Sequence, residues 1–163
     1  SIACNKEPSI PFGSGGKSLY SQSFAYKGCI AFGLNQNIVP KGATGDVDTD
    51  IAAKAEATMK LLQNNEFVIA HFNGSDEAAH RYDYEGKSQF IEKVDALFVS
   101  TIVKNYSEPL KIVICGDHVT SSITGKHGRG NTPVIAGAIN VSMNSVKLEN
   151  YHQILDFLMK ESD

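Results

Sequence analysis

At residues 67–72 the chain reads Phe-Val-Ile-Ala-His-Phe, a short apolar run typical of a buried strand. A second such run, Lys-Ile-Val-Ile-Cys, occupies residues 111–115. Each run is soon followed by an Asp and a His, namely Asp76 and His80 after the first and Asp117 and His118 after the second. Open α/β sheets bind ligands outside the carboxyl ends of their strands, so these side chains stand where a site is expected.

Segments with helical spacing alternate with the apolar runs. Apolar residues recur at helical spacing after Asp48-Thr-Asp50, which predicts a helix capped by Asp48 or Thr49 and ending near Asn64. A long helix is predicted for residues 85–105, with an apolar face formed by Phe90, Ile91, Val94, Leu97, Phe98 and Ile102. The remaining expected elements are strands at residues 29–34 and 133–138 and a closing helix around residues 151–158.

This alternation predicts an α/β fold with three layers, in which a mainly parallel sheet carries helices on both faces. Residues 1–17 are rich in Ser, Gly and Pro and include Gly13-Ser-Gly-Gly16. We therefore expect residues 1–26 to form a loop-rich N-terminal segment or a boundary. Residues 27–163 are expected to form one metal-binding α/β domain.

Composition limits the classes of protein to consider. Hydrophobic residues make up 42% of the chain and charged residues 20%, as in an ordinary globular domain. No apolar run approaches the ~20 residues of a membrane span. The net charge of −3 argues against nucleic acid as a partner, because nucleic-acid binders usually present a strongly basic face. The three Cys lack the spacing of a metal or redox motif, which favours a cytoplasmic location.

Five residues are candidate metal ligands: Asp76, His80, Asp117, His118 and His127, the last within Lys126-His-Gly128. Carboxylate and imidazole groups together suit Zn, Mn and related divalent ions. Asp76 and His80 are four residues apart, so one helical turn would place both on the same face. Asp117 and His118 are adjacent and would point in different directions, which suggests two ions.

A less specific interpretation exists for each residue taken alone. A single Asp after a strand is commonly a helix cap or turn former, and a single His is commonly a surface or hydrogen-bonded core residue. Three of the five His lie in the candidate stretches, and this joint occurrence favours a site. Of the other two, His71 is expected in the core or in support of the ligands, and His152 is expected to face solvent.

Several further motifs follow one another between Lys27 and Gly137: Lys27-Gly28-Cys-Ile-Ala, Gly42-Ala-Thr-Gly-Asp-Val-Asp-Thr-Asp50, Asp76-Glu-Ala-Ala-His80, Lys87 with Ile91-Glu92 and Asp95, Gly116-Asp117-His118, and His127 ahead of Thr132-Pro133-Val134. In order and spacing the chain resembles the metal-binding C-terminal half of the archaeal-type cofactor-independent phosphoglycerate mutases. These enzymes belong to the alkaline phosphatase superfamily. The resemblance implies an alkaline-phosphatase-like fold, of which this chain would be part.

The resemblance also implies a ligand set and a reaction. Asp76, His80 and His127 would hold one divalent ion, while Asp117 and His118 would supply part of the shell of a second, the ions being Mn, Zn or Mg. The substrate would be a phosphorylated small molecule. The implied enzyme is an isomerase of glycolysis that interconverts 3- and 2-phosphoglycerate through a phosphoserine intermediate.

The chain departs from the family pattern in two respects. Ala79 stands where the family favours Gly, and residues 1–24 contain no counterpart of the Asp that completes the second metal site. A Ser or Thr nucleophile is not recognised either. We therefore expect a portion of a longer polypeptide that carries no catalytic residue, depends on the remainder of that polypeptide and is inactive alone. The alternatives are another two-metal phosphotransferase or phosphohydrolase of the superfamily, or a non-catalytic metal-binding domain.

Three other features carry alternative interpretations. Arg129, directly after Lys126-His-Gly128, is a candidate substrate-binding residue because a guanidinium binds phosphate oxygens in pairs, although a solvated Arg in a flexible loop fits equally. Asp46, Asp48 and Asp50 alternate like a calcium loop, but capping explains them better. The charged residues Lys87, Glu92 and Asp95 fit a solvated helix face as well as a catalytic role.

Overall fold

The computed structural model describes residues 2–5 and 36–159. Its helices are α2 (Ile51–Leu62), α3 (Gly74–His80), α4 (Tyr84–Val94), the π-helix η1 (Asp95–Val99), α5 (Ser100–Asn105) and α6 (His152–Met159). Its strands are β1 (Ile2–Asn5), β2 (Gln36–Ile38), β3 (Phe67–Ala70), β4 (Leu110–Cys115), β5 (Val119–Ser121), β6 (Lys126–Gly128) and β7 (Val134–Ile139). The protein is therefore an α/β protein with helices and small sheets.

The strands form three small sheets, and every described pair is antiparallel. The first sheet has the order β2-β1-β3, the second pairs β4 with β7, and the third pairs β5 with β6. The expected mainly parallel sheet is not found among these strands. The reason is that β1 separates β2 from β3, while β7 returns beside β4 after the β5–β6 hairpin with no crossover helix between them.

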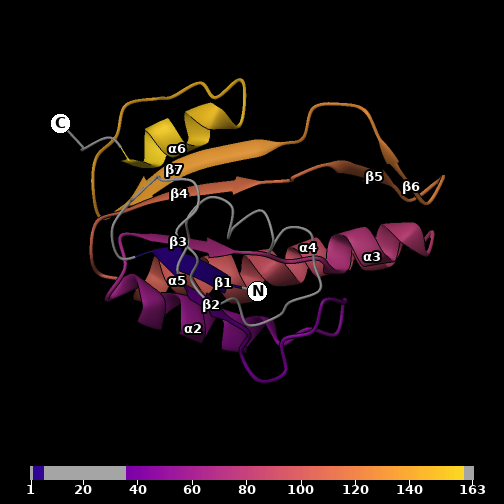
Figure 1. The fold of residues 1–163 in the computed structure, drawn as a ribbon, viewed down its shortest axis with the longest axis horizontal. Coiled ribbons are helices and arrows are strands. Elements are labelled where there is room, and N and C mark those ends of the chain that lie inside the picture. Colours follow the sequence, from indigo (N-terminus) through magenta and orange to yellow (C-terminus); the bar gives the residue numbers. More distant parts are fainter. Residues whose placement is uncertain (1, 6–35, 160–163) are drawn as a thin grey trace.

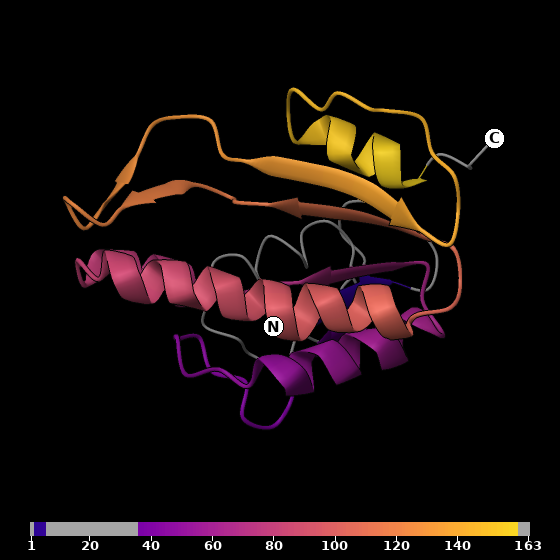
Figure 2. The ribbon, with the colours of Figure 1, turned by 180° about the vertical axis from the view of Figure 1, so that it is seen from behind.

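Figures 1 and 2 show how these elements stack. The long helical segment from α3 to α5 runs below the ribbon of β4 and β7, with α6 above that ribbon and α2 at the opposite side of the molecule. Lys111 on β4 donates to the carbonyl oxygen of Phe157 on α6 at 3.3 Å, which attaches α6 to the outer face of the ribbon. The β5–β6 hairpin extends over α3 at one end of the molecule.

The helix predicted after Asp48-Thr-Asp50 is present, but its cap differs from the expectation. The side chain of Asp50 accepts a hydrogen bond from the backbone N–H of Ala53 at 2.8 Å and so caps α2. Thr49 is buried instead, and its hydroxyl oxygen accepts from the backbone N–H of Thr44 at 3.0 Å. Capping rather than calcium binding thus accounts for Asp50.

The predicted long helix is confirmed, since α4, η1 and α5 follow one another without a break. Its buried stripe is narrower than predicted. Phe90 and Ile102 are buried and Phe98 packs edge-on against Phe72, with ring centroids 4.9 Å apart. Residues at i+4 spacing along this helix share one face, whereas Ile91 and Leu97 flank that face and are 53% and 47% exposed.

The core is small. The buried apolar side chains lie on α2, α3, α4 and α5 and are Ile51, Ala55, Leu61, Ala78, Ala79, Phe90 and Ile102. Within the described residues, no helix is long and apolar enough to cross a membrane. The strand expected at residues 29–34 and most of the segment 1–26 lie outside the described residues, while Ile2–Asn5 of that segment forms β1.

Candidate metal centre

Helix α3 presents the first two candidate ligands. It begins at Gly74, only a few residues after β3 ends at Ala70. A Cβ atom at Gly74 would lie 2.7 Å from the ring of Phe90, so the absence of a side chain lets α3 lie directly on α4. Asp76 and His80 then share one face of α3, as predicted, and His80 Nε2 lies 3.4 Å from Asp76 Oδ2.

The β5–β6 hairpin brings His127 to the same place. Its turn contains Gly125 in the left-handed region, with φ of +62°, which an L side chain adopts at a cost. The carbonyl oxygen of Gly125 accepts a hydrogen bond from His80 Nδ1 at 2.8 Å, so the hairpin is tied to α3. His127 Nε2 consequently lies 3.5 Å from Asp76 Oδ1 and 3.1 Å from His80 Nε2.

These three separations can be compared with the needs of a metal ion. Imidazole and carboxylate ligands bind Zn at ~2.0–2.2 Å in a tetrahedron, whose edges are then about 3.3–3.6 Å. Asp76 faces the two imidazoles with different oxygens, Oδ2 at 3.4 Å from His80 Nε2 and Oδ1 at 3.5 Å from His127 Nε2, and the two Nε2 atoms are 3.1 Å apart. The residues present therefore fit a small divalent ion with one ligand position left open.

The protonation of the two imidazoles supports this arrangement. Because a carbonyl oxygen only accepts, His80 Nδ1 must carry a proton, and in the neutral ring Nε2 then holds a lone pair. That lone pair faces Nε2 of His127 at 3.1 Å. Two lone pairs at this distance would repel, so the pair requires either a proton on His127 Nε2 or a cation between the rings.

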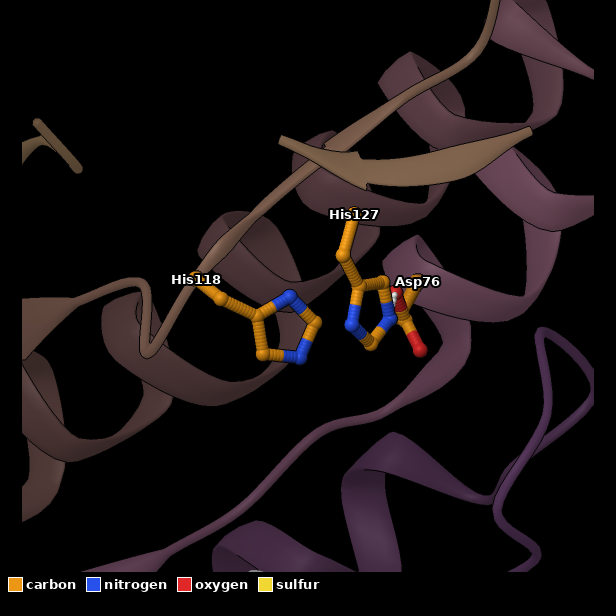
Figure 3. Close-up of side chains that lie close together, drawn as sticks. All are labelled: Asp76, His118 and His127. Atoms are coloured by element: carbon orange, nitrogen blue, oxygen red, sulfur yellow. Dashed lines mark ion pairs between the residues drawn. The ribbon is translucent and has the colours of Figure 1, made fainter. Parts of the chain in front are cut away.

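Asp117 and His118 lie beside this group, in the segment between β4 and β5. His118 Nε2 is 3.6 Å from Asp117 Oδ2, and the ring of His118 stacks on that of His127 with centroids 4.1 Å apart. Figure 3 shows His118, His127 and Asp76 side by side, and one ligand atom from each lies within 4.8 Å of the others. All five predicted ligands are thus neighbours, although the Asp117 side chain remains 67% exposed.

The sequence of this chain also matches known proteins. The sequence profile of the metalloenzyme superfamily matches residues 23–156. The chain belongs to this superfamily.

Its relatives include mutases. The chain is 37% identical over 108 residues to a 2,3-bisphosphoglycerate-independent phosphoglycerate mutase of Saccharolobus islandicus (strain L.S.2.15 / Lassen #1), an alignment that covers 66% of this chain and 26% of the relative. It is 32% identical over 119 residues to the enzyme of the same name from Methanococcus vannielii, covering 72% of this chain and 29% of the relative. The resemblance to archaeal cofactor-independent mutases is confirmed, and the chain spans about a quarter of the length of these curated relatives.

One solved structure resembles the fold of this chain. The structure of the PH0037 protein from Pyrococcus horikoshii superimposes with a TM-score of 0.63 at 27% identity. The superposition covers 78% of this chain and 39% of that protein. The similarity therefore extends over most of the present chain but less than half of its structural neighbour.

Two residues near the centre carry roles that the sequence did not indicate. Thr120 is buried between Asp76 and His118, and its hydroxyl contacts both. Lys87, for which a solvated helix face and a catalytic role were both considered, donates from Nζ to the carbonyl oxygen of Thr120 at 2.7 Å and is half-buried. The only signal for Thr120 is its position two residues after His118, which is too common a pattern to act on.

The remaining candidates lie at the edge of the centre. Arg129 is exposed directly after β6, so its role in binding substrate stays a prediction. His71 follows β3 and is half-buried, in agreement with the expectation of a supporting or core position. Burial lowers the pKa of His71, and the ammonium of Lys54 acts in the same direction, while the Asp117 carboxylate opposes them.

Proposed function

We propose that this chain is the metal-binding portion of a cofactor-independent phosphoglycerate mutase. The observation that carries the proposal is the convergence of Asp76, His80 and His127, in which each imidazole Nε2 lies within 3.5 Å of one carboxylate oxygen of Asp76 and the two Nε2 atoms are 3.1 Å apart. The superfamily match over residues 23–156 contains all five candidate ligands, and the archaeal relatives are 2,3-bisphosphoglycerate-independent phosphoglycerate mutases. The reaction would interconvert 3- and 2-phosphoglycerate in glycolysis, in the cytoplasm.

In this proposal the chain's residues divide between two positions. Asp76, His80 and His127 would hold one Mn, Zn or Mg ion, and Asp117 with His118 would hold part of the shell of a second. A bound pair of ions would neutralise the phosphate and stabilise the attacking and leaving oxygens. Arg129, two residues after His127 in the chain, would add a bidentate contact to the phosphate.

The nucleophile would come from elsewhere. None of the candidate residues here is an activated Ser or Thr, and the chain spans about a quarter of the relatives' length. The phosphoserine intermediate would therefore form on the remainder of the polypeptide, and the 163-residue chain alone is expected to show no mutase turnover. Turnover that is lost in His80→Ala would contradict this part of the proposal.

Calorimetric titration with Zn or Mn tests the metal site directly. We expect a stoichiometry near one tight ion per chain, because Asp76, His80 and His127 supply the three protein ligands usual for a catalytic zinc site. His127→Ala should abolish this binding. His152→Ala is the matched control, since His152 is an exposed imidazole on α6 that is not a candidate ligand.

Two outcomes would count against the proposal. Undiminished binding in the His127→Ala variant would show that the ligand assignment is wrong. Two equally tight ions per chain would show that Asp117 and His118 form a complete site without any contribution from the remainder of the protein. That result would favour a self-contained metal-binding domain.

A further inference from the structure

Thr120 occupies a buried position between Asp76 and His118, two candidate ligands that the proposed function assigns to different metal positions. It lies on β5, opposite His127 in the β5–β6 register, and only 5% of its surface is exposed. Its Oγ1 lies 2.5 Å from Asp76 Oδ1 and 3.1 Å from His118 Nδ1. One hydroxyl therefore touches one side chain from each ligand set.

The single proton of this hydroxyl fixes the direction of both hydrogen bonds. An ionised carboxylate only accepts, so the Thr120 hydroxyl donates to Asp76. The contact with His118 must then run the other way, with Nδ1–H donating to Oγ1. In the neutral ring of His118, Nε2 is consequently the nitrogen that keeps its lone pair, and it is the nitrogen that lies 3.6 Å from Asp117 Oδ2.

The position of Thr120 is itself held from α4. Lys87 Nζ donates to the backbone carbonyl oxygen of Thr120 at 2.7 Å, and the two residues are 33 positions apart in the sequence. The hydrogen bond from the Lys87 ammonium group therefore holds the backbone that carries the Thr120 hydroxyl. It is not the end of a mobile surface side chain, because both Thr120 and Lys87 are at least half-buried.

We infer that Thr120 is a positioning residue, which selects the Nδ1–H tautomer of His118 and orients the Asp76 carboxylate. The inference rests on the proposed function in that both side chains are taken as metal ligands. The hydroxyl then links the two positions, since it prepares one ligand for each. Loss of such a supporting partner typically lowers metal affinity by ~10–100-fold.

The test compares three variants. Thr120→Val removes the hydroxyl at nearly constant shape, and Thr120→Ser retains it. Thr101→Val is the control, because it removes a hydroxyl on α5 whose described hydrogen bond goes to the carbonyl oxygen of Leu97. The tautomer of His118 is read from the ¹⁵N shifts of its ring nitrogens by NMR, on metal-free protein, after circular dichroism has shown each variant to be folded. Zn and Mn affinity are then measured by calorimetry.

We expect His118 in the wild-type chain, in Thr120→Ser and in Thr101→Val to carry its proton on Nδ1. In Thr120→Val the Nε2–H tautomer should become substantially populated, and metal affinity should fall by ~10–100-fold. An unchanged His118 tautomer in Thr120→Val would overturn the inference, and so would loss of the Nδ1–H tautomer in Thr120→Ser. If Thr120→Val does not fold, the inference is tested by the wild-type chain and Thr120→Ser. It is overturned if His118 does not carry its proton on Nδ1 in both.

Failure of this inference can be told apart from failure of the proposed function. The tautomer is measured without metal and depends only on the hydrogen bond between Thr120 and His118. The proposed function depends on metal binding that requires His127, which does not touch the Thr120 hydroxyl in the described contacts. A wild-type chain that binds no metal but shows the expected tautomer change would refute the function and retain the role of Thr120.

Discussion

His71 shows how a single half-buried imidazole can make stability depend on pH. Burial lowers its pKa below the ordinary value of 6.5, so the unfolded chain takes up a proton at a higher pH than the folded chain does. The free energy of unfolding is therefore expected to fall as the pH drops below about 6.5 and on through the lowered value. Urea denaturation between about pH 7 and pH 5 should show a weaker pH dependence in His71→Gln than in the wild type.

The control for this prediction is His152→Gln, which removes an exposed imidazole from α6. That variant should keep the pH dependence of the wild type. Equal pH dependence in His71→Gln and the wild type would mean that His71 is not responsible, and attention would shift to the other imidazoles of the centre.

At the scale of elements, α6 is attached to the segment that carries Asp117. Tyr151, just before α6, donates from its hydroxyl to the carbonyl oxygen of Gly116 at 2.6 Å, and the same hydroxyl lies 2.5 Å from Thr132 Oγ1. Tyr151→Phe breaks both contacts and should lower the free energy of unfolding by ~0.5–1.5 kcal/mol, as measured by urea denaturation. Tyr84→Phe is the matched control, because its hydroxyl contacts only the exposed carboxylate of Glu85.

This prediction separates two roles for α6. If Tyr151→Phe costs no more than Tyr84→Phe, the hydrogen bonds of Tyr151 do not hold the segment, and α6 is attached mainly through its apolar side. The half-buried residues Ile154, Leu155 and Leu158 would then provide the attachment.

At the scale of the whole molecule, the small core makes the metal centre relevant to stability. The centre joins α3 to the β5–β6 hairpin and to the segment before β5, which are otherwise linked by few buried apolar residues. A ligand that binds only the folded state stabilises it by ~2.7 kcal/mol at a concentration of 100 times Kd. We expect Zn or Mn to raise the thermal unfolding midpoint, and a chelator to reverse this.

The same measurement on variants provides its control. His80→Ala should abolish the metal-dependent shift, whereas His152→Ala should retain it. A shift that persists in His80→Ala would mean that metal binds elsewhere on the chain, at residues outside the proposed centre.

The parts of this structure that depend on local spacing could be predicted from the sequence. Asp76 and His80 share a face because the helix geometry places residues four apart on one side, and the segment of α4, η1 and α5 follows from its apolar repeat. Strand partners could not be predicted in the same way. Every residue except Pro offers the same backbone donor and acceptor, so the sequence does not show which strands pair. The position of β1 between β2 and β3 could therefore not be predicted.

The same distinction applies within the candidate centre. Residue types and positions after strands were sufficient to select five candidate ligands that the structure places near one another. The contact of His80 with the Gly125 carbonyl and the contact of Thr120 with Asp76 join residues 45 and 44 positions apart, and they depend on how the β5–β6 hairpin folds over α3. Such contacts are set by tertiary structure, and no local pattern encodes them.

The spacing of the donor atoms at the centre bears on which cations are rejected. Calcium prefers six to eight oxygen ligands at ~2.3–2.6 Å, so a calcium ion would require more oxygens and a wider arrangement than this one. Here two of the three converging groups are imidazoles, and the contacts between the groups measure 3.1 to 3.5 Å. His80 is tied to the Gly125 carbonyl and Asp76 to the Thr120 hydroxyl, so widening the group would break protein hydrogen bonds. Under the proposed function, both the size of the centre and its ligand types would favour a small ion such as Zn over calcium.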